Sequence, residues 1–86
     1  MEILFTEQFD QAYEKLTNAE KRSIRKTLTL LGANPKHPGL RVKKMQGGKD
    51  IWEARTSKRL RVTFAMDGES ILMRNVGEHD KVLKRP

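Results

Sequence analysis

Three arginines, a histidine and a glutamate in the C-terminal half of the chain have side chains suited to phosphate chemistry. Arg55, Arg61 and Arg74 lie in the stretch IWEARTSKRLRVTFAMDGESILMRNV, and His79 follows it closely. A guanidinium group binds phosphate oxygens through a fixed fork of N–H donors, and an imidazole exchanges protons near neutral pH. Glu53 adds a carboxylate that can transfer a proton or hold an arginine in place. Together these residue types fit phosphate binding combined with proton transfer.

The last two strands of this stretch are predicted from one turn. Asp67-Gly68 is typical of a two-residue hairpin turn, because both residues tolerate the positive φ angles that such a turn requires. The facing pairs that follow from it are Met66 with Glu69, Phe64 with Ile71, Val62 with Met73, and Arg61 with Arg74.

The first strand of the stretch is placed by the alternation of side chains. Trp52 must share the core face with Val62 and Phe64, and this parity requires a loop with an odd number of residues. A loop formed by residues 57–59 satisfies the requirement. Trp52 then lies opposite Phe64, and Arg55 lies opposite Arg61.

These registers predict a row of arginines across three strands, on the face opposite the core. Like charges that face one another destabilise a sheet, so Arg55, Arg61 and Arg74 need either acidic neighbours or an anionic ligand. Glu53 and Glu69 are the acidic neighbours available for a structural role. A phosphate group is the alternative, and the sequence leaves both open.

The positive charge of the chain is confined to one segment. The formal net charge is +7, and residues 36–61 carry nine Lys and Arg against Asp50 and Glu53. The segments on either side each carry equal numbers of basic and acidic residues. Such a local excess fits a polyanionic partner, either nucleic acid or an acidic protein segment. A basic surface without a dedicated partner would have the same composition.

Several classes of function are excluded by the residues that the chain lacks. It has no cysteine and only two histidines, which excludes disulfides, thiolate metal sites and multi-histidine metal sites. Glycine-rich phosphate loops and zinc-finger spacings are absent too. We therefore expect no cofactor and no metal. The sequence shows neither a signal peptide nor an apolar run of the ~20 residues that span a membrane, so we expect a cytoplasmic protein.

The first half of the chain predicts one strand and two helices. Residues 2–5 suit a short strand, and Thr6 can cap the helix that follows. Thr17 and Glu20 have the spacing of a capping box that opens a second helix, which Asn34-Pro35 ends. Apolar side chains at helical spacing mark the buried faces of the two helices: Phe9, Ala12, Tyr13, Leu16, Ile24, Leu28 and Leu31.

The element order is therefore β-α-α-β-β-β-β within a single domain, residues 1–86. Residues 40–45 alternate like an edge strand, and the chain after Gly77 is predicted to be a polar tail or a single helical turn. The fold class is α+β, with a helical hairpin packed on a mostly antiparallel sheet in two layers. The predicted shared core consists of Phe9, Ile24, Leu28, Trp52, Val62, Phe64 and Ile71.

The second half of the chain resembles the RelE/ParE superfamily of toxins from bacterial type II toxin–antitoxin systems. The matching pieces are Gly-Leu-x-x-x-Lys at 39–44, Trp-x-x-Arg at 52–55, Leu-Arg-Val at 60–62 and Val-Gly-x-His at 76–79. They cover about half of the chain in the order that the family has. The resemblance implies a helical hairpin on an antiparallel sheet. It also implies a toxin that either cleaves mRNA on the ribosome or inhibits another target such as DNA gyrase.

The resemblance implies roles for individual residues. Arg61 matches the central-strand arginine that contacts the scissile phosphate in RNA-cleaving members, and His79 falls near a position where those members have an arginine or a histidine. We predict Arg61, His79 and Glu53 as catalytic residues of a metal-independent endoribonuclease. Further predicted phosphate-binding residues are Arg55, Arg74, Lys43, Lys44, Lys49 and Arg59. The chain departs from the best-studied RNA-cleaving branch in having no C-terminal tyrosine, which keeps a non-cleaving inhibitor, or a degenerate toxin that only binds its antitoxin, as the alternative.

The resemblance also implies partners. Many family members act on mRNA at the ribosome, and almost all are held inactive by a cognate antitoxin. We expect an acidic, amphipathic antitoxin with carboxylates against Arg41, Lys43, Lys44 or the arginine row. The alternative is that the C-terminal tail folds over the sheet and masks it.

Overall fold

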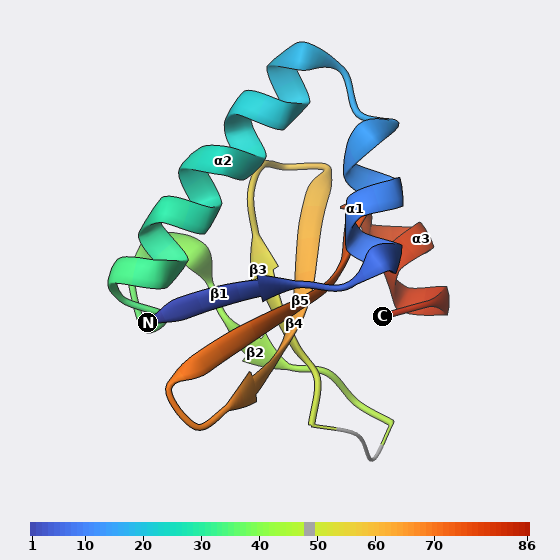
Figure 1. Ribbon diagram of the computed structural model, residues 1–86. Coiled ribbons are helices and arrows are strands. Elements are labelled where there is room, and N and C mark those ends of the chain that lie inside the picture. Colours follow the sequence, from blue (N-terminus) through green and yellow to red (C-terminus); the bar gives the residue numbers. More distant parts are fainter. Residues whose placement is uncertain (48–49) are drawn as a thin grey trace.

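A five-stranded sheet forms the centre of the molecule (Figure 1), whose computed structural model describes residues 1–47 and 50–86. In chain order the strands are β1 (Glu2–Phe5), β2 (Lys43–Lys44), β3 (Trp52–Arg55), β4 (Leu60–Asp67) and β5 (Ser70–Glu78). Across the sheet their order is β1-β5-β4-β3-β2, with β1 parallel to β5 and the other pairs antiparallel. The predicted α+β class and the predicted order of the first seven elements are confirmed.

Two helices between β1 and β2 form the hairpin (Figure 1), and both begin at the predicted caps. Helix α1 spans Glu7–Glu14, and the Thr6 hydroxyl accepts a hydrogen bond from the Phe9 amide at 3.1 Å. Helix α2 spans Asn18–Ala33, and its capping box is complete: the Glu20 amide donates to the Thr17 hydroxyl at 3.1 Å, and the Thr17 amide donates to the Glu20 carboxylate at 2.9 Å. Each such cap satisfies amide groups that have no partner within the helix. Among the described residues, no helix has the length and apolar character needed to cross a membrane.

The core lies between the hairpin and one face of the sheet. Phe9, Ile24 and Leu31 from the helices are buried against Val62 and Phe64 of β4. Ile71, Met73 and Val76 of β5 complete this cluster on the sheet side. Trp52 and Leu28 pack against it and are only partly buried, so five of the seven predicted core residues are fully inside.

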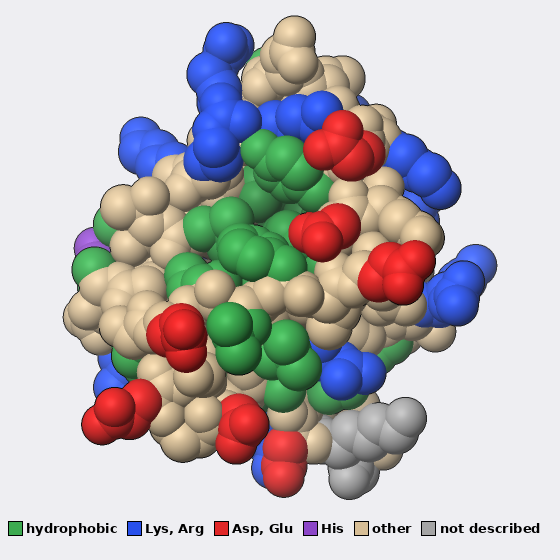
Figure 2. Space-filling model, viewed as in Figure 1, with side chains coloured by type: hydrophobic (Ala, Val, Ile, Leu, Met, Phe, Trp, Pro, Cys, Tyr) green, Lys and Arg blue, Asp and Glu red, His purple; other side chains and the backbone are tan. Residues whose placement is uncertain are grey.

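Apolar side chains are exposed between the two helices of the hairpin. Figure 2 shows hydrophobic side chains gathered in the centre of this face, with basic side chains above them and acidic side chains to their right. Phe5, Phe9 and Tyr13 form an aromatic row, with ring centroids 5.4 Å and 6.3 Å apart. The Arg25 guanidinium donates to the Tyr13 hydroxyl at 2.8 Å, which ties the two helices together.

The predicted register between β3 and β4 is confirmed. Trp52 pairs with Phe64, and Arg55 pairs with Arg61. The buried apolar side chains of β4 face the hairpin, so Glu53, Arg55 and Arg61 project from the opposite face, as the parity argument required.

The predicted register between β4 and β5 is wrong. The turn residues are Gly68 and Glu69, with Asp67 paired to Ser70, and a bulge between Thr63 and Phe64 shifts the ladder again. A slip by two residues keeps every side chain on the same face, so the apolar pattern could not detect the error. Beyond the bulge Arg61 faces Gly77 and not Arg74.

The segment before β2 is only in part the predicted edge strand. Residues Pro38–Leu40 form a 3-10 helix, η1, that buries Leu40, and Arg41 follows with a left-handed φ of 47°. This conformation interrupts the strand alternation, and the strand shortens to Lys43–Lys44. The edge strand predicted over residues 40–45 is therefore reduced to two residues.

The end of the chain packs on the second face of the sheet. Helix α3 (His79–Lys84) buries Val82 completely, and a Cβ placed on Gly77 would lie 3.9 Å from Val82 Cγ1. The Thr63 hydroxyl donates to the Pro86 carbonyl at 3.1 Å. Because Thr63 and Gly77 project away from the hairpin, α3 adds a short third layer. Of the two predicted alternatives, a polar tail or a single helical turn, the helical one is nearer to the structure, and Val82 supplies the apolar anchor that packs the helix on the sheet.

Candidate active site

Glu53 is the centre of a charged cluster on the second face of the sheet. Its side chain is 4% exposed. Lys43 Nζ lies 3.7 Å from Oε1, Arg61 Nε lies 3.8 Å from the same oxygen, and His79 Nδ1 lies 3.8 Å from Oε2. The structure thus brings together the three residues predicted as catalytic, Glu53, Arg61 and His79, with one of the predicted phosphate-binding lysines.

Four separate elements position this cluster. Lys43 on β2 lies directly across from Glu53 on β3. Arg61 lies on the next strand, β4, where it pairs with Arg55. His79 is the first residue of α3, and its backbone amide donates to the Arg59 carbonyl at 3.3 Å. Glu78 pairs with Arg59 at 3.1 Å beside it. The start of α3 is therefore anchored to the β3–β4 loop.

The surroundings of Glu53 offset the cost of burying its carboxylate. An isolated buried charge is strongly unfavourable, so buried carboxylates are found with cationic partners. Here the carboxylate has two cations, and a third when His79 is protonated. With Lys43 and Arg61 charged, the cluster keeps a positive surplus at the sheet surface, and this favours a bound anion.

His79 is held so that its two ring nitrogens have different surroundings. Its Nδ1 is buried and has no hydrogen-bond partner among the described residues, and the Glu53 carboxylate faces it. The side chain as a whole is 42% exposed. A carboxylate beside Nδ1 favours the tautomer that carries its proton on Nδ1. The other ring nitrogen, Nε2, is then free to accept a proton.

Arg61 also forms hydrogen bonds with the loop between β3 and β4. One guanidinium nitrogen donates to the carbonyls of Ser57, Lys58 and Leu60, at 2.8, 3.3 and 3.0 Å. Arg55 donates more weakly to the Ser57 carbonyl, at 3.4 Å. These bonds relieve the repulsion of two facing arginines, and they hold Arg61 as a fixed, mostly buried positive charge.

Comparison with known proteins identifies the fold but not a close relative. No family model matches the sequence, and no curated protein matches it either. Solved structures do match. The YafQ toxin in the Escherichia coli DinJ–YafQ toxin–antitoxin complex is 15% identical, with 94% of each chain covered and a TM-score of 0.79.

Two further solved structures match the chain with the same fold. The YoeB/ParE toxin of Agrobacterium tumefaciens is 16% identical, with 92% of this chain and 99% of that chain covered and a TM-score of 0.75. A chain of the RelE–RelB complex of Pyrococcus horikoshii is 20% identical, with coverages of 90% and 92% and a TM-score of 0.73. The chain has the RelE/ParE toxin fold.

In this RelE/ParE fold the predicted arginine row is broken. Arg74 does not face Arg61, because the two-residue slip moves it along the ladder and the bulge leaves it without a partner there. Its Nε donates instead to the Pro86 carbonyl at 3.2 Å. The predicted row across three strands is wrong. Only the Arg55–Arg61 pair remains, and Arg74 anchors the C-terminal segment.

Two other predicted phosphate-binding residues, Arg59 and Lys44, lie outside the cluster. Arg59 pairs with Glu78 at 3.1 Å, and Lys44 pairs with Asp50 at 2.9 Å. The hydrogen bond from Lys44 and its positive charge lower the pKa of Asp50 below its ordinary value. Lys49 lies outside the described residues.

The sequence indicated a polar tail or a single helical turn after Gly77, and it did not predict that α3 packs on the sheet. Val82 holds the helix on the sheet, and Gly77 gives it room to approach. The available signal was an apolar residue three positions after His79, on the helical repeat. Within residues 1–47 and 50–86 no cluster of three potential metal ligands occurs.

Proposed function

We propose that this chain is the toxin of a type II toxin–antitoxin system, that it cleaves mRNA on the ribosome, and that it therefore acts in the cytoplasm. The observation that carries the proposal is the convergence of Glu53, Arg61 and His79 on one face of the sheet, at 3.8 Å for each pair with Glu53. An acid–base group, a carboxylate and a fixed guanidinium are the parts required for transferring a phosphoryl group between two hydroxyls. The RelE/ParE fold supports the same reaction class.

The reaction proposed is attack by a ribose 2′-hydroxyl on the neighbouring phosphate. The attacking oxygen loses a proton, the leaving 5′-oxygen gains one, and negative charge builds on the phosphate between them. His79 is the exposed acid–base group, and the Glu53 carboxylate lies 3.8 Å from its Nδ1 on the buried side. Arg61 supplies positive charge at a fixed position, which costs no rearrangement during the reaction.

Lys43 is the residue best placed to meet the RNA backbone. Its side chain is 67% exposed and already lies 3.7 Å from Glu53, so its ammonium group can turn to a phosphate without leaving the cluster. Arg55 lies one position along β3 from the buried Ala54, on the same face as Glu53. Binding through such contacts weakens steeply as salt rises, because the phosphates release their counterions.

A cognate antitoxin is part of the proposal. The neighbours that share the fold include toxins solved in complex with DinJ and with RelB. A chain of net charge +7 with an exposed lysine at its reactive centre would bind RNA indiscriminately unless a partner covered it.

Expression of the chain alone in a bacterial host, followed by mapping of RNA 5′ ends, tests the proposal. The wild type should stop growth and create new 5′ ends within translated mRNA. His79→Gln should abolish both while leaving the fold and antitoxin binding unchanged, and Lys26→Gln, an exposed position on α2, serves as the control. Growth arrest without new RNA ends would instead indicate a non-cleaving inhibitor.

A further inference from the structure

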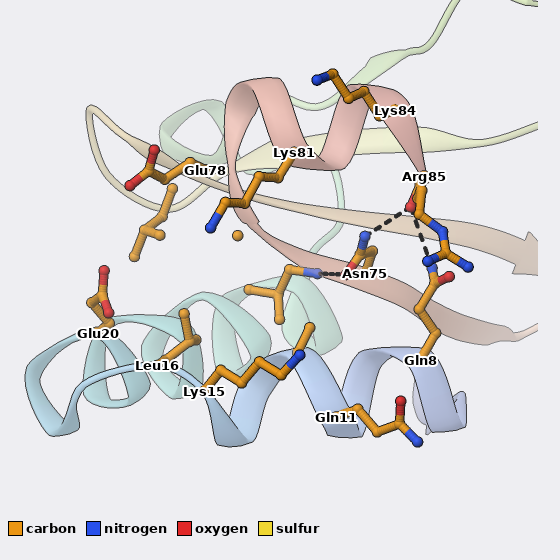
Figure 3. Close-up of a pocket in the computed structure, with 14 residues that line it drawn as sticks. Gln8, Gln11, Lys15, Leu16, Glu20, Asn75, Glu78, Lys81, Lys84 and Arg85 are labelled. Atoms are coloured by element: carbon orange, nitrogen blue, oxygen red, sulfur yellow. Dashed lines mark hydrogen bonds between the residues drawn. The ribbon is translucent and has the colours of Figure 1, made fainter.

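The helix that carries His79 is held at its far end by side chains from other elements. His79 is the first residue of α3, and the chain directly after this helix offers its backbone carbonyls to the rest of the fold. The Arg85 carbonyl accepts from the side-chain amides of Asn75 at 2.7 Å and Gln8 at 3.3 Å (Figure 3). Donors from β5 and α1 therefore meet at one carbonyl.

The next carbonyl, that of Pro86, is held on the second face of the sheet. The Thr63 hydroxyl donates to it at 3.1 Å, and Arg74 Nε donates to it at 3.2 Å. Thr63 is completely buried, so its hydroxyl needs a partner inside the protein, and the Pro86 carbonyl supplies one. The four donors to these two carbonyls form what we call the α3 clamp: Gln8, Thr63, Arg74 and Asn75.

Asn75 is oriented by both polar atoms of its side-chain amide. Its Oδ1 accepts from the Val76 amide at 2.9 Å, and this contact turns Nδ2 toward the Arg85 carbonyl. The bond from Nδ2, at 2.7 Å, is the shortest of the clamp. A carboxylate oxygen in the place of Nδ2 would face the carbonyl with no proton to donate.

Helix α3 depends on contacts of this kind because it has little stability of its own. It has six residues, whereas an isolated helix needs about 12–15 to be marginally stable in water. Within the described part of the chain, its N-cap Glu78 makes no side-chain hydrogen bond to the helix. Val82 is the buried residue that fixes its middle. The helical conformation of residues 79–84 therefore relies on Val82 and on the clamp.

The direction of the His79 side chain follows from this conformation. Glu78 is extended, with φ −67° and ψ 150°, and the helix begins at the next residue. The Cα–Cβ bond of a helical residue has a fixed tilt relative to the helix axis. If residue 79 left the helical conformation, the imidazole would turn away from Glu53, whose carboxylate now lies 3.8 Å from Nδ1.

We propose that Asn75 and Thr63 are positioning residues for His79, on which they act through α3. They keep the segment helical, and the helix keeps Nδ1 of the imidazole against Glu53. The consequence for RNA cleavage rests on the proposed function. The placement of the imidazole does not, because it can be measured without any substrate.

Two nearly isosteric variants remove donors of the clamp. Asn75→Asp keeps the oxygen that accepts from the Val76 amide and loses the donor to the Arg85 carbonyl. Thr63→Val loses the donor to the Pro86 carbonyl without a change of charge. Agreement between the two separates positioning from the added negative charge of Asn75→Asp.

The ¹⁵N NMR signals of the histidine rings report the placement directly. The chain has two histidines, and His37 is an internal reference. Its Nδ1 accepts from the Gly39 amide at 3.0 Å, which puts its proton on Nε2 in every variant. Wild-type His79 should carry its proton on Nδ1. In the double variant Asn75→Asp/Thr63→Val its ring signals should shift toward the mixed tautomers of an imidazole in water, and each single variant should show a smaller shift in the same direction.

Cleavage kinetics give the second measurement. Each single variant should lower kcat about fivefold, as the loss of one hydrogen bond implies, and should leave KM within about twofold. The matched controls are Asn34→Asp, where Oδ1 also accepts from a backbone amide, and Thr29→Val, which removes an exposed hydroxyl from α2. Both controls should keep the wild-type kcat and the wild-type His79 signals.

Wild-type His79 signals in the double variant would overturn the inference, even if that variant were less stable, because Asn75 and Thr63 would then be structural only. If the double variant does not fold, unchanged signals in both single variants lead to the same conclusion. Shifted signals with an unchanged kcat would confirm the positioning and contradict the catalytic role of His79. The NMR measurement involves neither ribosomes nor RNA, so it can fail while the proposed function stands, and the reverse.

Discussion

Replacement of Glu53 by glutamine separates the structural and the chemical roles of the cluster. The change removes one buried charge and keeps the shape of the side chain. Complete loss of one partner from a buried ion pair costs about 3–5 kcal/mol. The cost should be smaller here, because Lys43 is 67% exposed and can be solvated, and Arg61 keeps its three carbonyl bonds.

We therefore expect Glu53→Gln to lower the free energy of unfolding by about 1–2 kcal/mol. With a urea dependence of about 1 kcal/mol per molar for a domain of this size, the midpoint should fall by about 1–2 M. Trp52, the one tryptophan of the chain, is the adjacent residue on β3, so its fluorescence reports the transition. Cleavage of RNA by the folded variant should fall by about 100-fold.

The matched control is Glu78→Gln, which removes a half-exposed carboxylate paired with Arg59. It should change stability by less than about 1 kcal/mol. A loss of more than about 3 kcal/mol in Glu53→Gln, together with full activity of the protein that remains folded, would refute the reasoning. Glu53 would then be structural only. A gain in stability would show that the neighbouring cations do not offset the burial of the carboxylate.

Other predictions concern the core, a helix cap and one ion pair. Phe64→Ala, at a fully buried position, should cost about 3–5 kcal/mol in urea unfolding, and Trp52→Ala about half as much because Trp52 is only partly buried; equal costs would contradict the burial. Thr17→Ala should cost about 1 kcal/mol through loss of the capping box, and an unchanged midpoint would mean that the cap contributes nothing. By NMR titration the pKa of Asp50 should lie below its ordinary value and should return toward it in Lys44→Ala. Since a lowered carboxylate pKa stabilises the folded state above the unfolded pKa, that contribution disappears as the pH falls through the folded value.

The sequence was sufficient where an error would have moved side chains to the wrong face. A slip by one residue between β3 and β4 would have placed Trp52 on the face opposite Val62 and Phe64, so parity determined the register and located Glu53 beside Arg61. The helix caps were equally well determined, since Thr6, Thr17 and Glu20 act on backbone groups within their own turn.

The sequence was insufficient where the alternatives have the same parity or depend on distant contacts. The two-residue slip between β4 and β5 preserves both faces, and the bulge that displaces Arg74 has no residue pattern of its own. The alternation of residues 40–45 predicted a strand, but the left-handed backbone of Arg41 interrupts it and leaves only Lys43–Lys44 as β2. The packing of α3 depends on Val82 meeting Gly77, a contact that becomes visible only once the sheet is formed. The site was predicted to the extent that it follows from strand parity, and the packing of α3 beside it was not.

The chemical ends of the RNA fragments give the most direct test of the central claim, that Glu53, Arg61 and His79 direct a 2′-hydroxyl onto the neighbouring phosphate. Ribosomes programmed with a defined mRNA are incubated with the wild-type chain and with His79→Gln, with and without a chelator of divalent ions added after the complex has formed. The account predicts a 2′,3′-cyclic phosphate on the upstream fragment and a 5′-hydroxyl on the downstream fragment, unaffected by the chelator and missing with His79→Gln. A 5′-phosphate on the downstream fragment, or equal cleavage by the variant, would contradict it.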